Sequence, residues 1–207
     1  MNIFIDKILT ILMRCCIIIL NKFTKKGIDI FMPKIIENLR AKIIQEAKDQ
    51  IAINGYESVT IRNIAKGCEI GLGTFYNYFK SKDMLIATFL FEDWKERIAK
   101  ITDKYQNESD PMAVVHALYE EVSDFIKVYN AIFTAPSAIK TFSATAPGYH
   151  KFVRNQVAGP IYNSCVLSGI ENAEFLSLFV AESVITWTVA KKDYDEIAAI
   201  ISKLFVK

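Results

Sequence analysis

Residues 58–83 (SVTIRNIAKGCEIGLGTFYNYFKSKD) constrain the fold more than any other part of the chain. Thr60 is a favourable helix N-cap, since its hydroxyl can accept a hydrogen bond from a free backbone N–H. Ile64 and Ala65 follow it on what would be the apolar side of a helix. Gly67 stands near the end of this segment, where a left-handed backbone costs glycine little. The pattern predicts a short helix from Thr60 to about Gly67.

A second short helix follows the turn formed by residues 68–71 and runs to about Phe79. Phe75 and Phe79, at i and i+4, are expected to be buried on one side of it. Gly73 costs a helix stability relative to alanine, so its use is clearer if DNA must approach the backbone closely. The other faces carry small, hydroxyl and aromatic side chains, namely Leu72, Gly73, Thr74, Tyr76, Asn77 and Tyr78. Two helices joined by so short a turn predict a helix-turn-helix, whose second helix enters the major groove of DNA.

With these residues in place, the chain resembles the TetR family of bacterial transcriptional regulators. The resemblance covers roughly residues 34–90, and it depends on Gly55, Thr60, Ile64, Ala65, Ile70, Gly73, Thr74, Phe75, Tyr76, Phe79, Lys82 and Leu85. It implies an all-α fold, in which a three-helix DNA-binding head with a helix-turn-helix precedes a larger helical body for ligand binding and dimerisation.

The resemblance also implies which residues contact DNA: Thr60, Arg62, Leu72, Gly73, Thr74, Tyr76, Asn77, Tyr78 and Lys82. By the family pattern, Thr60, Tyr76 and Lys82 bond phosphates, while Gly73 and Thr74 face the groove. Most such contacts position a protein on DNA, and few of them read bases. Simpler interpretations stay open, because Thr60 is a cap in either case and Arg62 is also consistent with a solvated charge.

Three positions depart from the family pattern. Glu69 stands in the turn where glycine is common, so the turn must form without its most permissive residue. Gly71 replaces a frequent serine cap, and glycine is only a modestly poorer cap. Leu72 stands where a polar or basic residue often reaches DNA, and it suits contact with a thymine methyl group. The fold tolerates all three changes, but they make the operator sequence harder to infer.

The order of segments predicts three parts: an apolar extension over 1–31, the helix-turn-helix domain over 32–81, and the effector-binding and dimerisation domain over 82–207. The apolar run at 8–20 is thirteen residues long, whereas a membrane span needs about 20. We therefore expect a cytoplasmic protein whose natural start is Met32. A membrane-attached helical interaction protein anchored by residues 1–31 is the alternative.

Helical spacing recurs through the rest of the chain. It predicts a first head helix that follows Met32 and ends near Asn54-Gly55, and a long helix from Lys82 to about Tyr105. Further helices are expected at 112–129, at 148–167 with a kink at Gly159-Pro160, at 171–190 and at 193–205, with a broken stretch at 135–147. No alternation typical of strands stands out.

The net charge of +2 is too small for a protein that coats nucleic acid without specificity. Residues 32–90 carry eight Lys/Arg against six Asp/Glu, whereas residues 91–207 carry twelve against fifteen. The head is thus only weakly basic. Affinity for DNA would have to come from a homodimer with well-placed contacts more than from bulk charge.

The body offers candidates for a dimer interface and for an effector pocket. Apolar residues recur over the last two helices, where the family forms its four-helix dimer interface; those expected there, with one glutamate, are Phe175, Leu178, Phe179, Glu182, Ile185, Val189, Ile197, Ile201 and Leu204. An intramolecular helix pair is the competing interpretation. The family also holds an effector in the body, and the central aromatics suggest an apolar or aromatic small molecule contacting Phe89, Trp94, Tyr119, Phe125 and Phe142.

Other classes of function find little support in the sequence. Cys15, Cys16, Cys68 and Cys165 form no CxxC pair and no metal-like group with the two histidines, so neither a metal nor a cofactor is expected. Residues 71–76 begin like a dinucleotide fingerprint, but Tyr76 replaces its third glycine and no strand precedes it. We expect no enzyme, but a ligand-responsive regulator, most simply a repressor, that binds a near-palindromic double-stranded DNA operator.

Overall fold

The computed structural model describes residues 37–143 and 147–205. The expectations about residues 1–31 and about a start at Met32 lie outside this part of the chain. The described residues are helical throughout, with turns and short loops between the helices and no strand among them. The predicted all-α fold of a helix-turn-helix head and a helical body is confirmed.

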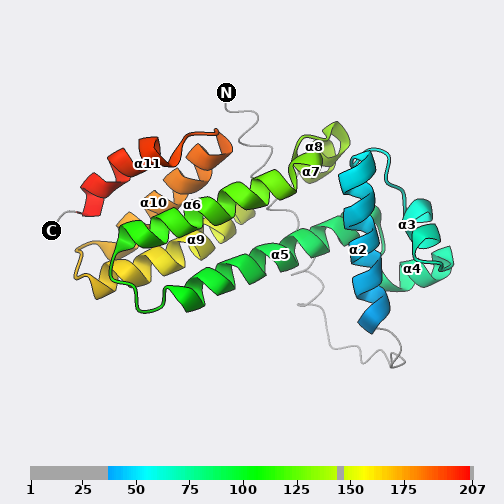
Figure 1. Cartoon of the computed structure of the whole chain (residues 1–207), viewed down its shortest axis with the longest axis horizontal. Coiled ribbons are helices and arrows are strands. Elements are labelled where there is room, and N and C mark those ends of the chain that lie inside the picture. The colour runs from blue at the N-terminus through cyan, green and yellow to red at the C-terminus, as the bar shows by residue number, and fades with distance from the viewer. Residues whose placement is uncertain (1–36, 144–146, 206–207) are drawn as a thin grey trace.

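Three helices build the head, which lies at one end of the molecule (Figure 1): α2 (Glu37–Asn54), α3 (Ile61–Gly67) and α4 (Leu72–Tyr78). Helix α2 ends before Gly55, which adopts φ +75° as expected of a C-terminal glycine. Its apolar side, with Ile43 and Ala47 fully buried, packs against α3. One apolar cluster therefore fixes the helix-turn-helix to α2.

Helix α5 (Lys82–Lys104) runs from the head along the body (Figure 1). Ser81 caps its start by accepting a hydrogen bond from the Met84 N–H at 3.0 Å. Leu85 and Phe89 are buried near the head, and Trp94 and Ile98 are buried farther along. Because these positions recur at helical spacing, a single stiff helix carries the core from head to body.

The body consists of α6 (Pro111–Val128), α7 (Asn130–Phe133), α8 (Pro136–Ser143), α9 (Pro147–Leu167), α10 (Ala173–Val189), α11 (Tyr194–Ile201) and the 3₁₀ turn η1 (Ser202–Phe205). Pro111 occupies the first turn of α6, where its missing N–H costs nothing. Pro160 lies inside α9, which continues past it as one helix. Helix α10 packs on both α9 and α6, so these three form the centre of the body.

A charged cluster joins α5 to α6. The Arg97 guanidinium donates to Asp93 on its own helix at 2.8 Å, and to Glu121 at 3.0 Å and Asp124 at 2.7 Å on α6. Burial alone would lower the pKa of Arg97, but hydrogen bonds to Asp124 and Asp93 raise it above its ordinary value. The half-buried arginine therefore remains charged and fixes the two helices to each other.

None of the described helices is long and apolar enough to cross a membrane.

Candidate nucleic-acid interface

The turn between α3 and α4 is held by local hydrogen bonds. Thr60 caps α3 as predicted, with its hydroxyl accepting from the Asn63 N–H at 3.2 Å. At the C-terminal end of α3, the Cys68 carbonyl accepts a hydrogen bond from Lys42 of α2 at 3.2 Å. Glu69 has φ +60°, so the turn does use the left-handed conformation that glycine adopts more easily. The two helices are thereby fixed at the angle on which a helix-turn-helix depends.

Helix α4 has one buried side and one side open to solvent. Phe75 is fully buried, and Phe79, which caps the end of the helix, is 2% exposed. On the open side, Leu72 is 41% exposed and Tyr76 is 43% exposed. A Cβ added to Gly73 would meet no atom within 4 Å, so packing inside the protein does not require glycine there. The missing side chain instead leaves room for a partner to approach the backbone of α4.

The structure brings most of the other predicted DNA contacts to the same region. Arg62 and Asn77 are exposed, while Thr74 and Tyr78 are half-buried beside the α4 surface. We call the exposed side of α4, with Leu72, Gly73, Tyr76 and Asn77, the α4 face. Its contacts with DNA remain predictions.

Lys82, predicted to bond a phosphate, has hydrogen bonds within the head. Its side chain is half-buried, and Nζ donates to the Tyr56 carbonyl at 2.8 Å and to the Val59 carbonyl at 2.9 Å. The ammonium also lies 3.9 Å from the centre of the Tyr56 ring. Burial lowers the pKa of Lys82. Two of its three donors thus serve the loop before α3, and we reinterpret this lysine as a structural clamp.

Sequence reasoning missed Lys80. This exposed lysine follows α4 directly, and its Nζ donates to the Tyr76 carbonyl at 3.0 Å. Its position two residues beyond Tyr78 was the available signal, because a lysine at the end of a groove-facing helix can reach a phosphate. Lys80 therefore adds an exposed positive charge beside the α4 face.

The predicted effector residues do not share one cavity wall. Phe89 lines a cavity of about 360 Å³ between α2, α5 and α7, whereas Tyr119 lines a different cleft against the turn after α10. Trp94 and Phe125 are buried and meet edge to face, with ring centroids 5.4 Å apart. The side chain of Phe142 lies outside the described residues. Several of these aromatic side chains are part of the core, because burial there removes most of their apolar area from water.

The predicted dimer residues also divide into two groups. Ile185, Val189, Ile197 and Ile201 are buried inside the subunit and cannot form a surface, so the intramolecular interpretation holds for them. Leu178, Glu182 and Leu204 are half-buried, whereas Phe175 and Phe179 are 69% and 49% exposed. Helical spacing alone does not separate the buried side from the exposed side when both are apolar.

Two buried cysteines are inert packing groups. Cys68 and Cys165 are buried, and burial raises the pKa of the Cys68 thiol and raises the pKa of the Cys165 thiol to about 11. At neutral pH both stay protonated and unreactive. No group of three or more metal-ligating side chains occurs among residues 37–143 and 147–205.

A supporting helix, a tight turn and a second helix with one open side define the class: this is a helix-turn-helix protein. Residues 43–88 match the family model described as bacterial regulatory proteins, tetR family. The head of this chain is therefore similar to the DNA-binding head of the TetR family.

Similar proteins agree with that assignment. The regulator UidR of Escherichia coli is 31% identical over 64 residues, which are 31% of this chain and 33% of UidR. The dhaKLM operon activator DhaS of Lactococcus lactis is 28% identical over 89 residues, or 42% of this chain and 48% of DhaS. The chain thus matches a third to a half of these relatives.

A TetR-family regulator from Haemophilus influenzae has the same fold, with a TM-score of 0.52. The superposition covers 84% of this chain and 97% of that protein, at 16% sequence identity. Sequence similarity is thus strongest around the head, whereas similarity of fold extends through most of the body.

Proposed function

We propose that this protein is a dimeric, sequence-specific DNA-binding transcriptional regulator whose affinity for its operator is changed by a small molecule. The observation that carries the proposal is the α4 face, with its open glycine, its exposed hydroxyl and amide groups and the phenylalanines that fix it from behind. Such a helix can enter the major groove without rearrangement, because its buried side already packs within the head.

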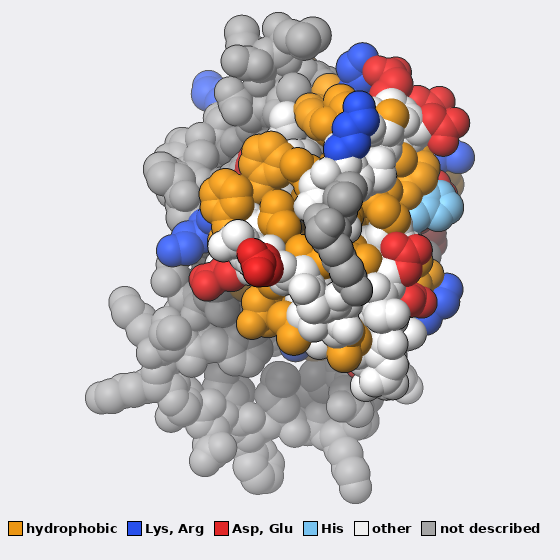
Figure 2. Space-filling view, turned by 90° about the vertical axis from the view of Figure 1, so that its left-hand side faces the viewer, with side chains coloured by type: hydrophobic (Ala, Val, Ile, Leu, Met, Phe, Trp, Pro, Cys, Tyr) orange, Lys and Arg blue, Asp and Glu red, His pale blue; other side chains and the backbone are white. Residues whose placement is uncertain are grey.

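Dimerisation is supported by an exposed apolar surface at the end of the body opposite the head. Phe175 and Phe179 of α10 stack with centroids 6.4 Å apart at 15°. Tyr162 and Val166 of α9 are 47% and 52% exposed. Figure 2 looks onto this end and shows hydrophobic side chains gathered there, with charged side chains mostly around them. Large apolar patches of this kind mark interaction sites.

A second copy of the chain is the occupant we assign to this surface. Two copies related by a twofold axis would bury the same patch twice and hold two α4 helices at a fixed distance. That spacing, about 34 Å or a multiple of it, requires a near-palindromic operator. A dimer on a promoter occupies DNA that the polymerase needs, so we propose repression as the direction of control. DhaS, by its name an activator, shows that relatives of this head include the opposite direction.

The test is fluorescence anisotropy of the full chain on labelled DNA from around its own gene, with unlabelled nonspecific DNA as competitor. The informative variant combines Tyr76→Phe and Asn77→Ala, which removes two polar groups from the α4 face and leaves its buried side intact. Hydrogen bonds to charged groups contribute about 1.5–3 kcal/mol, so we expect affinity to fall about tenfold or more. Lys100→Ala, on the far part of α5, is the control and should bind like the parent.

Two results would overturn the proposal. One is binding that all DNA competes for equally and that the double variant does not change. The other is tight operator binding by a species whose mass in sedimentation remains that of one chain. In vitro transcription from the bound promoter, with and without the protein, then decides between repression and activation.

A further inference from the structure

A cleft in the body, distinct from the aromatic core, is lined largely by polar and positively charged side chains. It has a volume of about 590 Å³ and lies between α6 and the turn that joins α10 to α11. The residues that line it are Tyr119, Ser123, Ile126, Lys127, Asn130, Thr188, Lys191, Lys192 and Asp193. Its volume falls within the range of small-molecule sites.

Charge in this cleft is strongly unbalanced. Three lysines line it against one carboxylate, Asp193, which accepts a hydrogen bond from the Asp195 N–H at the start of α11. Lys192 pairs with Glu196 at 2.7 Å. Lys127 and Lys191 form no ion pair with any described residue. With Lys192 paired to Glu196, the lining retains two lysines outside any ion pair and one carboxylate, Asp193, so its balance is positive.

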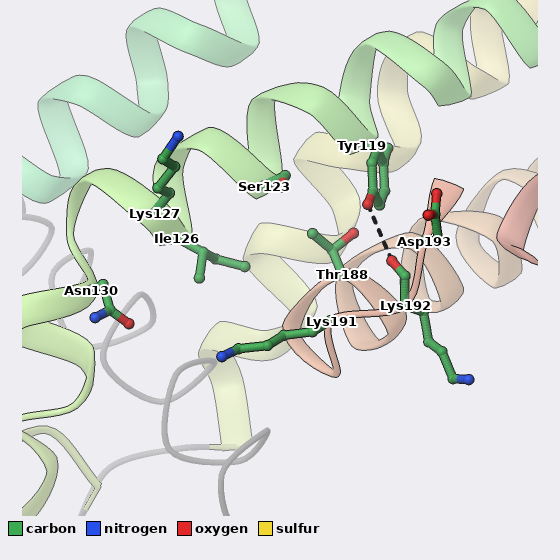
Figure 3. A pocket seen from close by; sticks show the side chains of 9 residues that line it. All are labelled: Tyr119, Ser123, Ile126, Lys127, Asn130, Thr188, Lys191, Lys192 and Asp193. Carbon is green, nitrogen blue, oxygen red and sulfur yellow. Dashed lines mark hydrogen bonds between the residues drawn. The ribbon is translucent and has the colours of Figure 1, made fainter. Parts of the chain in front are cut away.

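Lys191 is the member that reaches across the cleft. Figure 3 shows its side chain extended from the end of α10 toward Asn130, whereas Lys127 points away from it on the far side of α6. Ser123, Ile126 and Thr188 face the space between these helices. The side chains of Ser123 and Asn130 form no hydrogen bond with the described residues, so a hydroxyl and an amide remain to join the ammonium as donors.

The backbone at Lys191 is unusual for a lysine. It has φ +58°, and it stands directly after the helix where glycine is the common choice. The next N–H, that of Lys192, donates back to the Trp187 carbonyl at 2.9 Å, which closes the helix end. A lysine here pays conformational strain that glycine would avoid. The residue in this strained conformation carries the charged side chain that lies along the cleft.

We propose that this cleft binds a small oxyanion-bearing metabolite, with Lys191 as its charged partner and Ser123 and Asn130 as hydrogen-bond donors. Ammonium, hydroxyl and amide donors together suit a carboxylate or phosphate group, and hydrogen bonds to such ions are the stronger kind. The ligand is thus polar and anionic, in contrast to the apolar or aromatic effector expected from the sequence.

Its regulatory consequence rests on the proposed function. Asn130 is the first residue of α7, and α7 packs against α2 of the head. A ligand held between Lys191 and Asn130 would pull on the helix that supports the head. It alters DNA affinity only if it prefers one arrangement of head and body over the other.

Thermal unfolding of the full chain tests the binding site without DNA. The probes are inorganic phosphate and citrate, with glycerol and sodium chloride of matched ionic strength as controls. At a concentration of about 100 times Kd, a bound probe should raise Tm by about 5–10 °C. A response to phosphate alone or to citrate alone identifies which oxyanion the site accepts.

Lys191→Gly is the decisive variant, since it removes the charge and relieves the backbone strain together. We expect it to unfold at a higher temperature than the parent without probe and to lose the probe-dependent rise. Lys191→Arg should retain the rise, and so should Lys203→Ala, which removes an exposed lysine of η1. A probe-dependent rise in Tm that persists in Lys191→Gly would contradict anion binding in this cleft. So would the absence of a saturable rise in Tm with either probe.

Operator binding is measured separately with and without the effective probe. If the probe binds saturably but operator affinity does not change, the cleft is a binding site without a regulatory role. If the protein without any probe binds no operator, the proposed function is contradicted. The thermal result would still stand as evidence for the binding site.

Discussion

At the scale of single residues, three described positions other than glycine have positive φ, and at Glu69 and Lys191, unlike Asn172, the residue type is one that seldom adopts this conformation. Glu69 and Lys191 have φ +60° and φ +58°. For Lys191 we assign a ligand as the reason. For Glu69 the structure offers no partner that explains the choice, so it provides a clean test of the cost of the strain.

Replacing Glu69 by glycine should stabilise the head. A left-handed conformation costs a residue with a Cβ about 1–2 kcal/mol, and glycine avoids most of this cost. In a chain of this size the gain corresponds to a rise in Tm of about 2–4 °C per kcal/mol, which differential scanning calorimetry resolves. Glu69→Ala is the matched control: it removes the charge but keeps the Cβ, so it should leave Tm almost unchanged. An equal rise in both variants would assign the effect to charge.

Lys82 provides a second test at this scale, because the family resemblance and the structure assign it different roles. Lys82→Met keeps the aliphatic part but removes the hydrogen bonds to Tyr56 and Val59. The Tyr56 carbonyl still accepts from the Val59 N–H, whereas the Val59 carbonyl loses its Lys82 donor. Leaving a buried acceptor without its partner costs about 1–3 kcal/mol, so the urea midpoint should fall. The dependence of operator affinity on salt should keep its slope, because no phosphate contact is lost. If the salt slope of operator affinity falls by about one while stability is unchanged, Lys82 contacts a phosphate after all.

At the scale of secondary-structure elements, α10 has two sides with different tasks. One side, with Val180 and Val184, is fully buried against the subunit core, and the other presents Phe175 and Phe179. A helix that is apolar all round must be covered all round. The exposed side is therefore where we expect the second subunit.

Phe179→Lys should dissociate the dimer. Burial of a phenylalanine contributes about 1.5–3 kcal/mol, and in a twofold interface it is lost twice, so the dimer should weaken about 100-fold or more. Sedimentation velocity over a concentration series measures the change. The control is Ile53→Lys on α2, an equally drastic substitution at a residue that is 79% exposed in the head. Dissociation by both variants, or by neither, would show that this surface is not the interface.

Element boundaries followed from the sequence where caps and prolines set them. Thr60, Ser81 and Asp110 cap the helices that were expected to start beside them, and Pro111 occupies the first turn of α6. These are local interactions within one helical turn, so the sequence contains all the information needed. The broken stretch at 135–147 became a distinct helix, α8, because its first turn is capped from the head, a contact that no local pattern reveals.

At the scale of the whole molecule, that contact connects head and body. Glu57, in the loop after α2, accepts from the Ser137 N–H at 2.9 Å and from the Ser137 hydroxyl at 2.5 Å. Both hydrogen bonds lower the pKa of the Glu57 carboxyl. A second link joins Arg40 of α2 to Glu92 of α5, at 2.5 Å. These polar contacts add to the apolar packing of α2 on α5 and α7, beside the cavity lined by Phe89.

The Glu57 contact should weaken in acid. A carboxylate whose pKa is depressed on folding stabilises the folded contact above its ordinary pKa of 4.5, and this contribution disappears as the pH falls through the lowered value. Glu57→Gln should remove that dependence and speed hydrogen exchange at the first amides of α8 at neutral pH, while amides of α10 keep their protection. Unchanged exchange in α8 would mean that the contact does not hold the head.

The sequence by itself determined the helix-turn-helix, the all-α class and the long helix after Ser81. Each depends on spacing, caps and turn residues that act within a few positions of one another. Only the tertiary structure decided which apolar residues of α10 and α11 are core and which are surface. It also turned Lys82 inward, and it placed Lys191 opposite Asn130 across a polar cleft. These outcomes depend on segments far apart in the chain, whose mutual positions result from packing the whole body and not from any local pattern.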